Sequence, residues 1–218
     1  MLSRLNLLVS FIIDTVFPPP PLVQRLIGLS VEEIISEISR SDSLPDKNSI
    51  AILSYKHPLT RTAIWEMKYR GNRAITRKMA LVIYDYLLIE LSEASTWQNF
   101  TEPIIVPIPL SPERLRERGY NQAGKLAKEL VKIDKGENFK LNSDWLKKVR
   151  STDSQSHTRN RTERLNNLKN CFSASSDVEG KNIILLDDVI TTGATMKEAK
   201  NTLRQAGAKK VICVAVAH

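Results

Sequence analysis

The chain contains 218 residues, of which 42% are hydrophobic and 26% are charged, proportions typical of one globular domain with at most a small appendage. Its eight glycines exclude a collagen-like chain, and its two cysteines, Cys171 and Cys213, are too few for a disulfide scaffold or an all-cysteine zinc site. A net charge of +8 favours phosphorylated or polyanionic partners, although a solvated basic surface explains it equally well.

The apolar stretch 5–17 is the candidate membrane segment. It contains Asp14 and is shorter than the roughly 20 residues that a spanning helix needs. Prolines occupy 18–21, where a signal peptide would have small residues at its cleavage site. Its apolar residues fall on one helical face, so we expect an amphipathic helix that docks on the domain or on a partner. We expect no transmembrane segment and a cytoplasmic location.

Capping residues and apolar periodicity mark the elements of the first half. Ser30 and Glu33 have the spacing of a capping box that opens a helix. The other predicted elements are a linker at 41–48, a strand at 50–55, a helix at 58–69 and a longer helix at 74–94.

Strands and helices alternate in the second half, which predicts a parallel sheet covered by helices on both faces. The predicted strands are 104–108, 145–149, 183–186 and 211–216, and the predicted helices are 121–133 and 195–205. A basic loop follows the strand at 104–108. The stretch 151–162 is polar without periodicity and is predicted to be a mobile loop.

Residues 183–195, with the sequence IILLDDVITTGAT, form the segment that indicates a ligand-binding site. Four apolar residues form a buried strand that ends in Asp187 and Asp188, and a short loop then opens a helix. Ligands of open parallel sheets bind beyond the carboxyl ends of the strands. The N–H groups of a helix N-terminus favour a phosphate at that edge, and Gly193 lets the backbone approach it closely.

The two adjacent carboxylates would repel a phosphate in direct contact. They can instead accept hydrogen bonds from neutral hydroxyls beside the phosphate, such as the diol of a ribose. The segment therefore predicts a single ligand, a 5-phosphorylated ribose. A Walker A loop is excluded because Gly-Lys-Ser/Thr does not occur in the segment.

This segment resembles the phosphoribosyl pyrophosphate (PRPP) loop of the type I phosphoribosyltransferases. Within that superfamily the sequence is most similar to the ComF family, the competence-protein homologues. The resemblance covers about 50–218 and extends to Lys-Tyr-Arg-Gly at 68–71, to 106–122 with Arg-Gly-Tyr-Asn-Gln at its end, and to 150–168.

The resemblance implies an α/β fold of the type I phosphoribosyltransferase kind at 49–218, with a parallel sheet flanked by helices. Residues 1–48 are then an N-terminal helical extension. ComF-type proteins commonly have a cysteine zinc ribbon in this region, but no cysteine occurs there. We therefore expect a degenerate extension without zinc ligands and no zinc.

The resemblance also implies roles for individual residues. Asp187 and Asp188 are expected to be the catalytic pair and to hold the ribose hydroxyls, directly or through Mg²⁺. The residues expected to cradle the 5-phosphate are Thr191, Thr192, Gly193, Ala194 and Thr195. The cations expected to grip pyrophosphate or to close a lid over it are Lys68, Arg114, Arg118, Arg150, Arg159 and Arg161. A solvated basic surface explains the arginines almost as well, and it explains Lys68 better.

Residues outside these motifs carry weaker predictions. The three histidines, His57, His157 and His218, have no metal-ligand spacing and are predicted to be incidental. The three tryptophans, at 65, 97 and 145, are predicted to pack in the interior and not to stack on bases.

The resemblance favours a PRPP-dependent transferase, and the sequence does not identify its acceptor. Two other functions stay open. One is an accessory protein that binds single-stranded DNA in DNA uptake, alone or with competence proteins. The other is a non-catalytic protein that binds PRPP and reports it to a partner. A homo-oligomer is compatible with the sequence.

Overall fold

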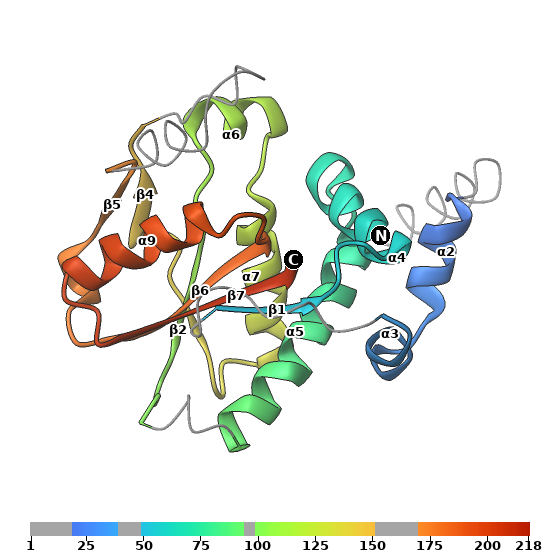
Figure 1. Ribbon diagram of the computed structural model, residues 1–218, viewed down its shortest axis with the longest axis horizontal. Helices are drawn as coiled ribbons and strands as arrows, with labels where there is room; N and C mark the ends of the chain where they lie inside the picture. The colour runs from blue at the N-terminus through green and yellow to red at the C-terminus, as the bar shows by residue number, and fades with distance from the viewer. Residues whose placement is uncertain (1–18, 39–48, 94–98, 151–169) are drawn as a thin grey trace, which may run out of the picture.

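The computed structural model describes residues 19–38, 49–93, 99–150 and 170–218 (Figure 1). The predicted helix at 5–17, linker at 41–48 and polar loop at 151–162 lie outside the described residues. None of the described helices is both long enough and apolar enough to cross a membrane.

A five-stranded parallel sheet forms the centre of the molecule, as predicted. Its strands are, in spatial order, β1 (Ser49–Leu53), β7 (Lys210–Ala217), β6 (Asn182–Val189), β2 (Ile104–Pro107) and β3 (Lys140–Leu141). Every neighbouring pair is parallel. β6 and β7 lie inside the sheet, so their carboxyl ends are flanked by other strands on both sides.

Helices cover both faces of the sheet (Figure 1). Alternate residues of β6 face opposite layers: Ile184 and Leu186 contact the layer of α5 (Arg73–Glu93) and α7 (Gln122–Asp134). Ile183 and Leu185 contact α9 (Ala194–Gln205) on the other face. On that second face a small antiparallel hairpin also packs, made of β4 (Leu146–Lys148) and β5 (Phe172–Ala174), followed by the 3₁₀ turn η3 (Ser176–Val178).

The N-terminal segment contributes two short helices to the first layer, α2 (Pro21–Gly28) and α3 (Val31–Glu37). The predicted capping box is confirmed, because Ser30 and Glu33 each bond the other's backbone N–H, at 3.1 and 2.7 Å. Leu26 and Ile34 are fully buried and belong to the same apolar cluster as the core of α5. The domain boundary at residue 48 stays a prediction.

Several elements differ from the prediction. α2, β3 and β5 were not predicted, and the strand expected at 145–149 appears as β4, which pairs with β5 outside the parallel sheet. The helix expected over 58–69 is divided into α4 (Pro58–Trp65) and a π-helical turn, η1 (Glu66–Arg70). The expected basic loop contains a helix, α6 (Pro112–Arg118). Its capping signals are Ser111 at the N-cap, proline at the first position and Gly119 at φ 74° after the end. The helix has no buried residue, so no apolar periodicity indicated it.

Candidate functional site

The predicted phosphate loop, residues 191–195, lies where β6 ends and α9 begins. Thr191 and Thr192 are exposed, and Gly193 takes a left-handed conformation at φ 73° as the N-cap of α9. Gly193 provides no side-chain cap, and the Ala194 N–H lies 3.4 Å from Thr192 Oγ1. The first turn of α9 therefore presents N–H groups at the carboxyl edge of the sheet, which suits an anion.

The loop is anchored where it leaves the sheet. The Ile190 N–H donates to the Ala217 carbonyl at 2.9 Å, and His218 Nδ1 donates to the Ile190 carbonyl at 2.8 Å. His218 was predicted to be incidental, but it fixes the residue that precedes Thr191. No local sequence signal indicated this, because the contact depends on the pairing of β6 with β7.

Asp187 and Asp188 point to opposite faces of the sheet. Successive residues of a strand alternate sides, so Asp188 shares its face with Ile184 and Leu186, and Asp187 shares the other face with Ile183 and Leu185. Asp187 Oδ1 accepts the backbone N–H of Asp188 at 2.8 Å. The two acids therefore meet different partners, although the sequence suggested one shared role.

Asp188 is enclosed and paired. Its exposed fraction is 2%, and its Oδ2 lies 3.0 Å from Lys68 Nζ of η1. Gln122 Nε2 of α7 lies 3.4 Å from Oδ1. The ammonium lies outside hydrogen-bonding geometry, so buried Oδ2 keeps an unused acceptor position. Lys68 was predicted to grip pyrophosphate; in the structure it contacts Asp188, and its role toward pyrophosphate stays a prediction.

The Arg-Gly-Tyr-Asn-Gln stretch at 118–122 contacts several elements of the candidate site. Tyr120 Oη donates to the carbonyl of Met67, the residue before Lys68, at 3.0 Å. The Asn121 side chain donates to the Ile108 carbonyl at 2.9 Å and caps α7 through the Ala123 N–H at 3.0 Å. The motif thus links η1, the end of β2 and Asp188.

Asp187 lies on the side of the hairpin. Burial, then the neighbouring charge of Asp188, raise the pKa of the Asp187 carboxyl well above its ordinary value. Lys148 of β4 is half-buried nearby, and burial lowers the pKa of its ammonium group. The Arg114 guanidinium lowers this pKa further, whereas the Asp187 carboxylate raises it. Sequence analysis missed Lys148, although its alternation with buried Leu146 placed it on the sheet side of the hairpin.

The predicted arginine clamp is not assembled. Arg118 NH1 donates to Gln122 Oε1 at 3.0 Å, and its guanidinium lies 5.4 Å from the Tyr69 ring centroid. Arg114 is exposed on α6, and Arg150 is exposed after β4. Arg159 and Arg161 lie outside the described residues. Arg118 therefore positions Gln122, and the cation that opposes the raised pKa of Asp187 is the Lys68 ammonium.

An exposed aromatic surface adjoins Lys68. Trp65 and Tyr69 are 47% and 61% exposed, with ring centroids 5.8 Å apart, and the Arg70 guanidinium lies 5.1 Å from the Trp65 ring. They line a groove of about 800 Å³ between α2 and η1. The prediction that Trp65 packs in the interior is wrong, because its α4 position faces outward. Trp145 is half-buried, and Trp97 lies outside the described residues.

Among the described residues, no three His, Cys, Asp or Glu side chains gather into a metal-binding group. The absence of zinc stays a prediction. The donor set at the sheet edge consists of carboxylate and hydroxyl oxygens, which suits a hard cation such as Mg²⁺ shared with phosphate groups.

Known proteins match this chain over its sheet-forming part. The family description "Phosphoribosyl transferase domain" matches residues 85–218. The chain is 40% identical over 106 residues to Competence protein ComFC of Bacillus subtilis, which covers 48% of this chain and 39% of that protein. It is 31% identical over 165 residues to Competence protein F of Haemophilus influenzae, covering 74% of this chain and 69% of that protein.

A third relative is DNA utilization protein YhgH of Salmonella typhimurium, 29% identical over 171 residues that cover 77% of this chain and 70% of that protein. The chain thus spans well under half of the first relative and about 70% of the other two. The domain match, the parallel sheet and the phosphate loop agree with one another. The chain belongs to the ComF family of the phosphoribosyltransferase superfamily, and it has the type I phosphoribosyltransferase fold.

Proposed function

We propose that the protein binds PRPP with Mg²⁺ at the carboxyl edge of its sheet and transfers the phosphoribosyl group to an acceptor. The observation that carries this proposal is the position of Asp187 and Asp188 beside the N-terminus of α9, where the N-cap Gly193 provides no side-chain cap. A phosphate-binding turn next to two acids matches a ligand that carries both a phosphate and a diol. We propose a cytoplasmic location together with this substrate.

In this proposal residues 191–195 hold the 5-phosphate through backbone N–H groups and threonine hydroxyls. Asp188 supplies the buried acceptor, Oδ2, and Lys68 neutralises it until the ligand enters. Asp187 presents a carboxylate on the opposite face, toward Lys148. The two acids therefore have different roles: Asp188 orients the sugar, and Asp187 faces the pyrophosphate.

The residues present fit Mg²⁺, which binds proteins through one or two carboxylates together with substrate phosphates and water. Asp187 is the better ligand, because Asp188 already has Lys68 and Gln122 as partners. When bound, Mg²⁺ would neutralise charge on pyrophosphate and make it a better leaving group.

The transfer step forms a bond from a lone pair of the acceptor to the anomeric carbon. The bond from that carbon to the pyrophosphate oxygen breaks, its electron pair leaves with pyrophosphate, and the acceptor gives up its proton. Lys68 and Lys148 approach the acids from the two faces of the sheet. We propose that their ammonium groups stabilise the negative charge that grows on the leaving group.

Calorimetric titration of PRPP with and without Mg²⁺ tests this proposal on wild type and on Asp187→Asn combined with Asp188→Asn. We expect Mg²⁺-dependent binding whose affinity falls on the order of 100-fold in the double variant, since two charge-assisted contacts are lost. The matched control is Asp144→Asn with Glu179→Gln, which removes two exposed carboxylates elsewhere. Unchanged affinity in the double variant refutes the assignment. Binding without pyrophosphate release under any acceptor would favour the PRPP sensor.

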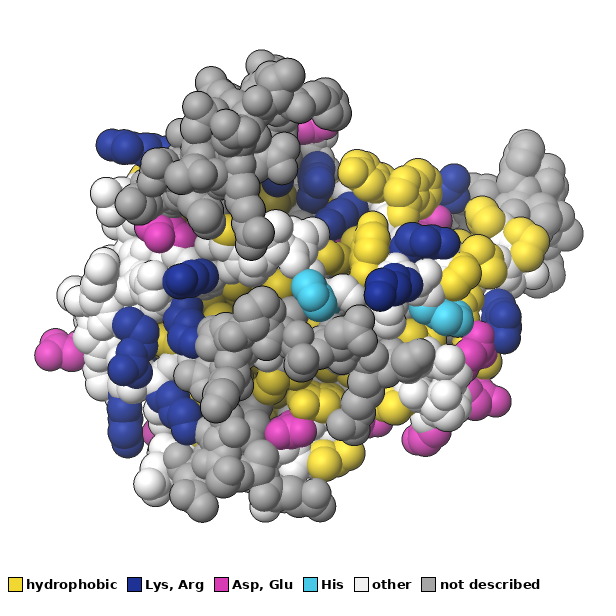
Figure 2. All heavy atoms as spheres, viewed as in Figure 1, with side chains coloured by type: hydrophobic (Ala, Val, Ile, Leu, Met, Phe, Trp, Pro, Cys, Tyr) yellow, Lys and Arg dark blue, Asp and Glu magenta, His cyan; other side chains and the backbone are white. Residues whose placement is uncertain are grey.

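A second candidate function is binding of single-stranded DNA, and the aromatic surface favours it. Figure 2 shows hydrophobic side chains among Lys and Arg side chains on this side of the molecule. Trp65 and Tyr69 alternate with Arg70 and Arg118, which offers rings for bases and guanidinium groups for phosphates. Relatives are named for competence and for DNA utilization.

Binding of a fluorescent oligo-dT to Trp65→Ala with Tyr69→Ala tests the second candidate. We expect an affinity loss of about tenfold or more, because each stacked base contributes roughly 1–3 kcal/mol. The control is Leu88→Ala with Ile89→Ala, two exposed apolar residues of α5. Equal affinity for oligo-dT in both double variants would show that the aromatic surface does not bind single-stranded DNA.

A further inference from the structure

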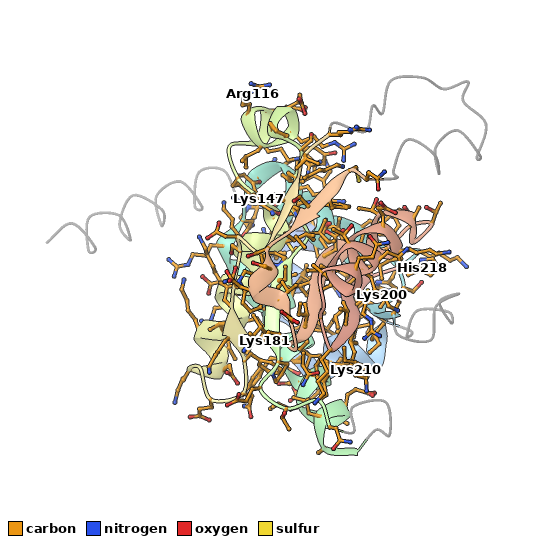
Figure 3. All side chains as sticks on the ribbon, turned by 90° about the vertical axis from the view of Figure 1, so that its left-hand side faces the viewer. Arg116, Lys147, Lys181, Lys200, Lys210 and His218 are labelled. Atoms are coloured by element: carbon orange, nitrogen blue, oxygen red, sulfur yellow. The ribbon has the colours of Figure 1, made fainter. Side chains whose placement is uncertain are left out.

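A second groove lies between α6, the first turns of α7 and the hairpin strand β4. It encloses about 600 Å³, a volume within the range of small-molecule sites. In Figure 3, Lys147 of β4 lies below α6, which carries Arg116 at the top of the view. The acid pair and the phosphate loop contribute no described residue to the lining.

The walls of this groove combine an apolar floor with basic groups. Pro109, Leu110 and buried Leu146 contribute to the floor, and Leu115 is 45% exposed at its edge. Four lysines also line it: Lys125, Lys128, Lys147 and Lys148. Among the described residues of the lining there is no Asp or Glu. In a chain with 24 acidic residues, lysines gathered in a lining without acids mark a preference for an anion, although Asp187 and Glu113 act on Lys148 from outside the lining.

Two of these lysines are held in place by aromatic rings. Lys125 Nζ lies 3.5 Å from the centroid of Tyr120, and Lys148 Nζ lies 5.7 Å from that of Phe172. Such cation–π contacts orient the ammonium groups without neutralising their charge. These two lysines therefore differ from the freely moving lysines of a solvated surface, whereas Lys128 and Lys147 are exposed.

We propose that this groove binds a nucleoside phosphate, with the phosphates among the lysines and the base on the floor of prolines and leucines. Inorganic phosphate alone would leave the apolar floor uncovered. A nucleic-acid strand needs an extended track, whereas this lining surrounds a single hollow of about 600 Å³. The groove contains neither acid and no residue of the phosphate loop, although it shares Lys148 with the proposed PRPP site. The inference therefore rests on the other three lysines and does not depend on the proposed function.

The test is titration of ADP into the full chain in the presence of saturating PRPP and Mg²⁺. We expect ADP to bind although PRPP is present. Lys128→Glu with Lys147→Glu should lower ADP affinity by about tenfold or more, because both exposed lysines become repulsive. The control is Lys181→Glu with Lys209→Glu, which changes the net charge equally at exposed positions outside the groove lining and should leave the affinity unchanged.

Several outcomes would overturn the inference. Equal losses in the two double variants would indicate a general charge effect, and an unaffected Lys128/Lys147 variant would exclude the groove. Displacement of ADP by PRPP would assign the binding to the phosphate loop. Pyrophosphate that binds as tightly as ADP would show that the apolar floor makes no contribution. If PRPP itself does not bind, the comparison of the two double variants still shows whether ADP binds in this groove.

Discussion

The two faces of the sheet at the end of β6 are built differently. On the helix side, Asp188 is buried and contacts Lys68 and Gln122, which other elements hold in place. On the hairpin side, Asp187 is half-buried and adjoins the exposed threonines of the phosphate loop. One carboxylate is therefore compensated within the protein, whereas the other carries an energetic cost that a ligand or cation can relieve.

Under the proposed function, this difference separates the residues that stabilise the fold from those that bind PRPP. The contacts of Tyr120 with η1 and of Gln122 with Asp188 lie on the helix side, and Asn121 joins them to the end of β2 through Ile108, all without a ligand. The exposed phosphate loop and Lys148 lie toward the hairpin. Substitutions on the helix side should therefore reduce stability and binding together, whereas those on the hairpin side should affect binding alone or even increase stability.

The largest expected effect is that of Asp188→Asn alone. It leaves the Lys68 ammonium without its carboxylate, so we expect the free energy of unfolding to fall by about 2 kcal/mol. This is less than for a fully buried pair, because the Lys68 side chain is 23% exposed and asparagine keeps one acceptor oxygen. Urea denaturation measures the change. Asp144→Asn is the exposed control, and equal stability of the two variants would contradict the comparison.

A smaller effect is expected for Tyr120→Phe. The substitution keeps the ring beneath Lys125 but removes the hydroxyl that donates to the Met67 carbonyl. We expect a loss of about 1 kcal/mol in the free energy of unfolding, together with weaker PRPP binding, because the turn that carries Lys68 is less restrained. Tyr69→Phe, at a side chain that is 61% exposed, is the control. Equal PRPP affinity in the two variants would show that the Tyr120 hydroxyl does not contribute to PRPP binding.

Much of the fold was predictable, because apolar runs and capping residues are local signals. The strands at 104–108, 183–186 and 211–216 and the capping box at Ser30 all appear in the structure. The short helix α6 was missed because it buries no residue. The order of the strands was not predictable either, since it depends on contacts between distant segments.

The site was predictable in its types of residue but less so in their arrangement. The motif located both acids, and strand alternation alone would have placed them on opposite faces. The contacts of Asp188 with Lys68 and of His218 with Ile190 join residues far apart in the chain, so no local pattern indicates them. The exposure of Trp65 depends on what α4 packs against, which a residue type does not reveal.

The smallest expected effect, and the one of opposite sign, is that of Asp187→Asn on stability in metal-free buffer. The pKa of this carboxyl is raised by burial and by Asp188, so the folded state holds a proton that the unfolded state has released. Between the ordinary pKa and the raised one, the stability of wild type therefore falls as pH increases. Asparagine keeps the oxygen that accepts the Asp188 N–H but has no charge to bury.

We therefore expect Asp187→Asn to be more stable than wild type near neutral pH, with the difference vanishing as pH falls through the ordinary pKa of aspartate. Thermal unfolding at a series of pH values measures this difference. Asp144→Asn, at an exposed position, should show no comparable gain. A variant that loses stability at neutral pH would show that Asp187 is compensated as fully as Asp188, and the contrast between the two faces would fail.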